Sequence, residues 1–156
     1  MKIVFGSDHA GFALRRILSS RAIDQGHTVS EVGARDEQPY DYPDAAAEVA
    51  RRVQAVGVDF GVLICGTGIG MAIAANRFKG VRAANVWNEH TARMAREHNH
   101  ANVLCLGGRL IAPDEALKIF DAFLAEPESK EARHARRVDK MDMLGDAGEA
   151  AVASKS

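Results

Sequence analysis

Residues 65–70 of this chain read Cys-Gly-Thr-Gly-Ile-Gly, which places a thiol and a hydroxyl among three glycines. A short apolar run comes before them and an Ala-rich segment comes after, so they are predicted to form a turn between a buried strand and a helix. Glycine lets a ligand approach the backbone, and the free N–H groups of a helix N-terminus favour an anion. The pattern therefore predicts chemistry on a small anionic substrate.

The two cysteines differ in their surroundings. A cysteine that ends an apolar strand, such as Cys65, is most often a buried apolar side chain. The predicted helix N-terminus beside it, however, favours the reactive thiolate. Cys105 has no such neighbour and is expected in the core. With no Cys-x-x-Cys pair and no metal-ligand spacing, neither a disulfide nor a metal site is expected.

A second polar cluster, Ser7, Asp8 and His9, follows the first predicted strand. Taken singly, Asp8 could only cap the next helix, as Thr67 could cap its own, and His9 could be an ordinary surface histidine. Open parallel sheets, however, bind ligands outside the carboxyl ends of their strands, where the strand order reverses. In the common order 2-1-3-4-5 that point lies between strands 1 and 3. Asp8 and His9 are therefore expected to meet Cys65 in one crevice.

The elements that must position these residues alternate between strand and helix. Strands are predicted at residues 2–7, 28–32, 58–65, 80–86 and 102–106, and helices at 9–25, 45–56, 68–78, 88–98 and 113–124, with a polar loop at 37–44. This alternation predicts an α/β fold: a Rossmann-like three-layer αβα sandwich around a five-stranded parallel sheet of order 2-1-3-4-5. An additional C-terminal helix is expected within residues 126–144, as an arm toward a partner subunit. Residues 145–156 are predicted to be disordered.

Composition limits the classes of protein that fit. The 156 residues suffice for a single domain, here residues 1–144, and an apolar content of 47% is ordinary for a globular protein. The formal charge of −1 argues against a nucleic-acid partner. No apolar run is long enough for a signal peptide or a membrane span. The sequence therefore predicts a cytoplasmic protein without a membrane partner.

Three basic residues in the second half of the chain could also serve a site. His98 ends a predicted helix, where the helix dipole favours its protonated form, although a histidine there could equally be a simple cap. Arg133 and Arg137 are four residues apart and share a helix face, so their guanidinium groups could grip a phosphate. A solvated basic face is the equal alternative, because three glutamates lie nearby, at positions 126, 128 and 131.

Together these motifs resemble the type B ribose-5-phosphate isomerases, which form a wider family with the galactose-6-phosphate isomerase subunits. The resemblance extends from residue 1 to about residue 142 and rests on segments 6–12, 41–43, 65–70, 74–76, 97–99, 107–109 and 133–137. It implies an aldose–ketose isomerase without metal or organic cofactor, working as a homodimer or homotetramer whose active site is shared between two subunits. The expected reaction interconverts D-ribose 5-phosphate and D-ribulose 5-phosphate. The alternatives are the same chemistry on erythrulose 4-phosphate, allose 6-phosphate or galactose 6-phosphate, and a non-catalytic sugar-phosphate-binding module.

The resemblance also implies roles for individual residues. Cys65 is the base that moves a proton between C1 and C2 through a cis-enediol, and His98 assists opening of the furanose ring with Asp8. Thr67 and the backbone around Gly66, Gly68 and Gly70 hold the sugar oxygens. Tyr42 and Asn99 contact the sugar, and Arg109 also binds the substrate. The phosphate is bound by His9, Arg133 and Arg137.

One departure from the family pattern lies just before the first of these arginines. Many members have two glycines there, whereas this chain has Glu131 and Ala132. The substitution is expected to alter the phosphate pocket or the length of substrate that it accepts.

Overall fold

The computed structural model describes residues 1–55 and 57–144, so the predicted helix end at residue 56 and the predicted disorder of residues 145–156 lie outside the described residues. Within these residues a five-stranded parallel sheet forms the centre, in the order β2-β1-β3-β5-β4. Its strands are β1 (Lys2–Ser7), β2 (Thr28–Gly33), β3 (Phe60–Cys65), β4 (Ala83–Asn85) and β5 (Val103–Gly107).

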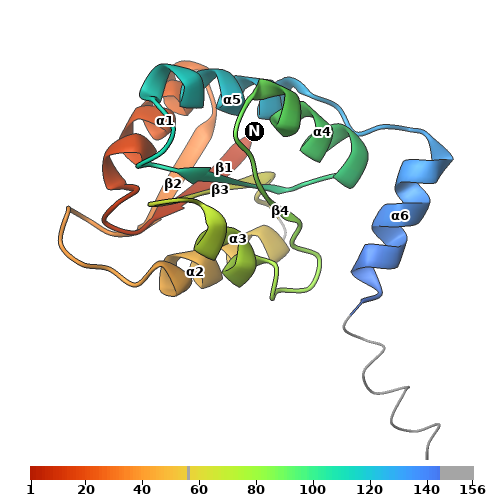
Figure 1. Cartoon of the computed structure of the whole chain (residues 1–156), viewed down its shortest axis with the longest axis horizontal. Helices are drawn as coiled ribbons and strands as arrows, with labels where there is room; N and C mark the ends of the chain where they lie inside the picture. The colour runs from red at the N-terminus through yellow and green to blue at the C-terminus, as the bar shows by residue number, and fades with distance from the viewer. Residues whose placement is uncertain (56, 145–156) are drawn as a thin grey trace, which may run out of the picture.

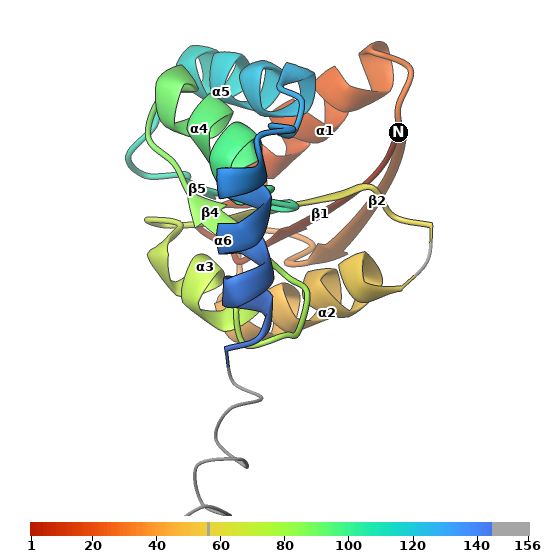
Figure 2. The same ribbon diagram turned by 90° about the vertical axis from the view of Figure 1, so that its right-hand side faces the viewer.

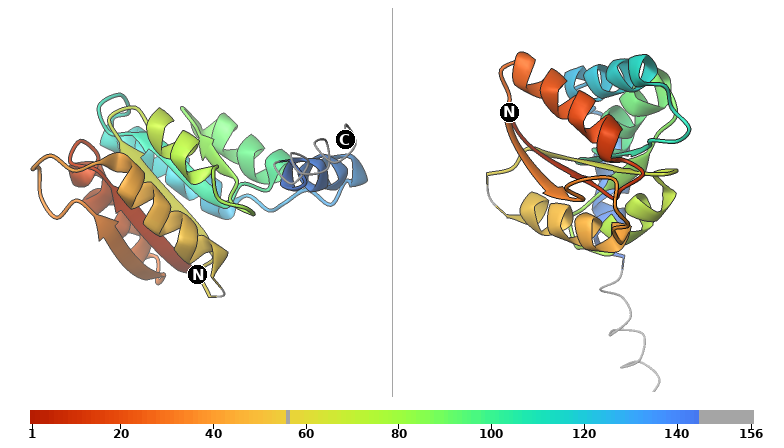
Figure 3. Two further views of the ribbon diagram at one scale, coloured as in Figure 1. Left: turned by 90° about the horizontal axis from the view of Figure 1, so that it is seen from below. Right: turned by 90° about the vertical axis from the view of Figure 1, so that its left-hand side faces the viewer.

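Helices cover both faces of the sheet, which confirms the predicted αβα sandwich. One face carries α1 (Phe12–Asp24), α4 (Glu89–Asn99) and α5 (Pro113–Ala125), and the other carries α2 (Tyr42–Gln54) and α3 (Ile69–Ala75) (Figures 1 and 3). Each face buries its own apolar cluster. On the α1 side, for example, the rings of Phe5 and Phe120 pack with centroids 5.8 Å apart.

The strand order corrects the predicted one at one edge of the sheet. β5, rather than β4, lies next to β3. All five residues of β5 are buried, and a strand buried on both faces is stabilised most in the interior of a parallel sheet. The three residues of β4 are only half-buried, which suits an edge. The reversal of order between β1 and β3, which places the site, is as predicted.

β4 is also shorter than the strand predicted at residues 80–86. The Asn76 side chain exchanges two hydrogen bonds of 2.8 Å with the backbone of Ala83. Asn102 likewise donates to the Gly80 carbonyl and accepts from the Arg82 N–H, each at 2.8 Å. These side-chain amides satisfy backbone groups that a longer strand would have paired, so the ladder begins only at Ala83.

Two helix starts differ from the prediction near the site. α1 begins at Phe12 instead of residue 9, because residues 8–11 form the loop that follows β1. α2 begins at Tyr42, inside the segment predicted as a loop. Pro43 lies in its first turn, where a missing N–H costs no helical hydrogen bond, so the proline starts this helix instead of excluding it.

The additional helix, α6 (Ala132–Asp142), is present and stands apart from the layered body in Figure 1. In Figure 2, which is turned by 90°, it lies in front of the body. It is tied to the body at both ends. The ring of His134 stacks on that of His98 in α4, and the Asp142 carboxylate pairs with Arg82 at 3.0 Å. An arm held at two points can present its remaining side chains in fixed positions.

Candidate active site

The carboxyl ends of β1 and β3 lie side by side, as predicted. The Asp8 N–H donates to the Ile64 carbonyl at 3.3 Å. Gly11 packs so closely on the same carbonyl that a Cβ there would lie 2.2 Å from its oxygen. The Asp8 carboxylate is 7% exposed and accepts the Gly11 N–H at 2.9 Å. Asp8 therefore fixes the loop before α1 and is not the N-cap of that helix, which is Gly11; its role in a site stays a prediction.

Cys65 ends β3 with its thiol facing the glycine-rich turn. The side chain is 5% exposed, and its Sγ accepts the Gly68 N–H at 3.1 Å. This hydrogen bond fixes the Sγ atom at the start of the turn that leads into α3.

Cys105 behaves as the sequence predicted. It is a free cysteine in the middle of β5, and it is fully buried. Burial raises the pKa of the Cys105 thiol far above its ordinary range, because the thiolate would lose its hydration. Cys105 is therefore an inert core thiol, in a strand that pairs with the one that ends at Cys65.

The turn after Cys65 is held from the neighbouring strand. The Gly108 N–H donates to the Cys65 carbonyl at 2.8 Å, and the Arg109 N–H donates to the Gly66 carbonyl at 3.1 Å. The Thr67 hydroxyl accepts the Ile69 N–H at 3.3 Å, whereas the N-cap residue of α3 is Gly68, so Thr67 does not cap this helix. Because its backbone is fixed in this way, the turn can offer N–H groups to an anion without rearrangement.

Three more predicted residues lie close to this turn or to the loop after β1. The Arg109 side chain lies over Gly66, where a Cβ would be 3.5 Å from its Cδ. The Tyr42 ring lies over Gly70, where a Cβ would be 2.7 Å from the ring. His9 accepts the Tyr40 N–H at Nδ1 (3.2 Å), so the proton of its neutral ring is assigned to Nε2.

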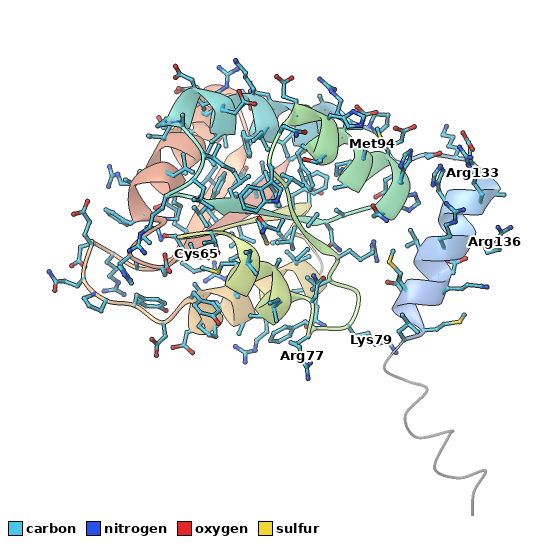
Figure 4. The ribbon with its side chains drawn as sticks, in the orientation of Figure 1. Cys65, Arg77, Lys79, Met94, Arg133 and Arg136 are labelled. Carbon is cyan, nitrogen blue, oxygen red and sulfur yellow. The ribbon has the colours of Figure 1, made fainter. Side chains whose placement is uncertain are left out.

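The other four predicted site residues, His98, Asn99, Arg133 and Arg137, lie elsewhere. α4 starts beyond the carboxyl end of β4 and runs back toward the amino end of β5. Its 11 residues therefore carry His98 and Asn99 about 16 Å away from the crevice end of the sheet. Figure 4 shows Cys65 on the body and Arg133 across the molecule, on α6. A single chain does not bring the two groups together.

The distant group is organised around a pair of imidazoles. The rings of His98 and His134 are stacked, with centroids 4.3 Å apart and planes inclined by 2°. Desolvation lowers the pKa of His134, and the nearby charges of His98 and Arg133 lower it further. His134 is 4% exposed, and its membership of this group was not predicted from the sequence. Its four-residue spacing to Val138, the other buried residue of α6, was the available signal.

A groove of about 870 Å³ separates α6 from the body. Its walls include Asn99 at the end of α4, Arg77 and Arg82 from the segment around β4, and Met141 of α6. The groove therefore opens beside one member of the distant group.

Neither a metal centre nor a membrane span is found within residues 1–55 and 57–144. No cluster of three His, Cys, Asp or Glu side chains there is arranged around a common point. No helix in that part of the chain is both long and apolar enough to cross a bilayer.

Gly68→Ala is expected to damage the turn. Gly68 has φ +79°, and a Cβ would lie 2.5 Å from Asn85 Oδ1. Left-handed backbone strain and overpacking together should lower the free energy of unfolding by about 2 kcal/mol or more, measured by urea denaturation. Gly80→Ala is the control, because Gly80 has φ +74° with nothing within 4 Å of a Cβ. Equal losses in the two variants would show that the contact with Asn85 does not matter.

Comparison with known proteins shows the family to which the chain belongs. Ribose-5-phosphate isomerase B of Escherichia coli is 42% identical over 123 residues, which are 79% of this chain and 83% of the relative. The structure of ribose-5-phosphate isomerase B from Clostridium thermocellum superposes with a TM-score of 0.91 at 43% identity, over 94% of this chain and 98% of that one. For the protein from Thermotoga maritima the TM-score is 0.89 at 44% identity, over 92% and 98%. The sequence pattern of the family described as Ribose/Galactose Isomerase matches residues 3–141, and the chain belongs to that family.

Proposed function

We propose that this protein is an aldose–ketose isomerase that interconverts D-ribose 5-phosphate and D-ribulose 5-phosphate. The observation that carries the proposal is the position of the Cys65 thiol, held by the Gly68 N–H in a glycine-rich turn at the point where strand order reverses. The relatives named ribose-5-phosphate isomerase B support the choice of a pentose phosphate as the substrate.

The proposed chemistry is a proton transfer between adjacent carbons. The Cys65 thiolate removes the proton on C2 of the open-chain aldose, the electron pair moves to the C1 oxygen, and protonation of that oxygen gives a cis-enediol. The same thiol then returns the proton to C1 while the C2 hydroxyl loses its proton and becomes the carbonyl of the ketose. One proton has then moved from C2 to C1 and one from the C2 oxygen to the C1 oxygen, so atoms and charge balance without a co-reactant. Negative charge that develops on the sugar oxygens is stabilised by Thr67 and by the backbone N–H groups of residues 66–70.

The remaining residues are proposed to open the sugar ring and to hold the substrate. His98 exchanges a proton with the ring oxygen, and Asp8 assists the same opening of the furanose ring. Phosphate binding far from the reacting carbons orients the open chain. Tyr42 and Asn99 are proposed to contact the sugar, His9, Arg133 and Arg137 the phosphate, and Arg109 the substrate at the mouth of the crevice.

This assignment requires two copies of the chain. The thiol and the phosphate arginines lie at opposite ends of one subunit, so a complete site forms only where α6 of one copy reaches the crevice of another. The groove beside Asn99 supports this arrangement, because it leaves room next to α6 for an edge of the second copy. We therefore propose a homodimer, or a homotetramer built from such dimers. Its dependence on a free thiol suits the reducing cytoplasm.

The decisive test compares three substrates with purified protein in the presence of EDTA. We expect the highest kcat/KM for D-ribose 5-phosphate, above D-allose 6-phosphate and D-erythrulose 4-phosphate. Preference for one of the other two would leave the proposed chemistry intact and overturn the proposal that ribose 5-phosphate is the substrate. Binding of all three without turnover would show that the protein is a non-catalytic sugar-phosphate-binding module and not an isomerase.

Arg137→Ala is expected to raise KM for the sugar phosphate about 10- to 100-fold while kcat stays within a few-fold. The reason is that a charge-assisted hydrogen bond to phosphate contributes about 1.5–3 kcal/mol and is remote from the reacting carbons. Steady-state kinetics measures the change. Arg136→Ala is the control, since Arg136 lies on another face of α6. A fall in kcat without a change in KM would contradict a phosphate-binding role for Arg137.

A further inference from the structure

The carboxylate of Glu131 forms an ion pair with Arg133, one of the two α6 arginines proposed to bind phosphate. Glu131 Oε2 lies 2.6 Å from Arg133 Nε. Arg137 lies one turn further along α6, and among the described residues it forms neither a hydrogen bond nor an ion pair. Of the two guanidinium groups, one is therefore paired inside the chain and the other is free.

Glu131 is held where an anion is electrostatically favoured. It is the N-cap residue of α6, and its side chain makes no capping hydrogen bond. Its backbone is fixed, because its N–H donates to Ser129 Oγ at 3.2 Å and its carbonyl accepts the His134 N–H at 3.0 Å. The carboxylate thus sits at the positive end of a helix dipole and beside a guanidinium group, as a bound phosphate would.

The pair is open to replacement by a ligand. The side chains of Arg133 and Glu131 are 59% and 58% exposed, and Figure 4 shows Arg133 near the start of α6. Ion pairs this exposed are weak, because water and salt screen them. A phosphate dianion carries more charge than a carboxylate and offers more acceptor oxygens, so it can displace Glu131 from Arg133.

We propose that Glu131 sets the affinity of the site for phosphate: it is an internal competitor that the substrate phosphate must displace from Arg133. The inference rests on the proposed phosphate role of Arg133 and Arg137. Phosphate first engages the free Arg137, and its second contact forms only when Arg133 leaves Glu131. Glu131 thereby weakens the binding of phosphate esters and does not act on the proton transfer.

Glu131→Gln is expected to lower KM for D-ribose 5-phosphate about two- to fivefold, the range for loss of an exposed ion pair, with kcat unchanged within twofold. The dissociation constant of inorganic phosphate, measured by calorimetry, should fall by the same factor. The matched control is Glu48→Gln on α2. Glu48 pairs with Arg52 at the same 2.6 Å and with similar exposure of 45% and 41%, and it should leave both quantities unchanged.

A double-mutant cycle separates competition for Arg133 from a general charge effect. In an Arg133→Met background, Glu131→Gln should no longer change KM or phosphate affinity, because the contested guanidinium group is gone. An undiminished gain in that background would overturn the proposal, as would an unchanged KM in the single variant. Failure of the proposed function is a separate result, since the wild-type protein would then turn over none of the three sugar phosphates.

Discussion

Cys65→Ala is expected to lower kcat for ribose 5-phosphate isomerisation by about three orders of magnitude, the loss typical of removing a positioned general base. Alanine removes only the sulfur, and the turn keeps its hydrogen bonds from Gly108 and Arg109. The variant should therefore still bind D-ribose 5-phosphate, with a dissociation constant within a few-fold of the wild-type KM. Stopped assays of ketose formation give the rate, and calorimetry gives the affinity.

Cys105→Ala is the control for this variant. Its thiol is fully buried and takes no part in the proposed reaction. The substitution should therefore lower the free energy of unfolding and leave kcat near the wild-type value. Iodoacetamide should inactivate the wild-type protein and the Cys105→Ala variant at the same rate. Turnover by Cys65→Ala within tenfold of wild type would mean that another group removes the proton.

The parts of the site that are local in sequence could be predicted from it. The turn at residues 65–70 is six residues long, and its glycines, thiol and hydroxyl indicate a strand, a turn and a helix N-terminus without long-range information. The meeting of Asp8 with Cys65 needed only the reversal of strand order between β1 and β3, which is the usual point in such sheets.

Other features depend on contacts between distant residues and could not be read from the pattern. The exchange of β4 and β5 follows from burial of β5 on both faces, which two short apolar runs do not reveal. The side-chain clamps of Asn76 and Asn102 shorten β4 through contacts of 7 and 22 residues in sequence separation. Glu131 stood out as a departure from the family, but its pairing with Arg133 is visible only in three dimensions.

A mixture of two inactive variants is expected to regain activity if the site is shared. The first variant, Cys65→Ala, has a defective crevice and an intact distant group. The second, His98→Ala, has an intact crevice and a defective distant group. In a mixed dimer the two defects fall in one site and the other site is wholly intact. Equal amounts, exchanged to equilibrium, should recover about a quarter of wild-type activity, since about half of the dimers are mixed and each has one working site of two.

The matched control mixes Cys65→Ala with Asp8→Ala, whose defects lie in the same crevice. Each site of that mixed dimer carries one defect, so no activity should return. Co-expression with two different tags, followed by purification through both, isolates the mixed dimers and should raise the recovery in the first pair to about half of wild type. If the Cys65→Ala and His98→Ala pair stays inactive while the tags prove that mixed dimers form, each site is built from one chain. In that case α6 would have to leave its contacts with α4, including the His98–His134 stack, to bring Arg133 and Arg137 to Cys65.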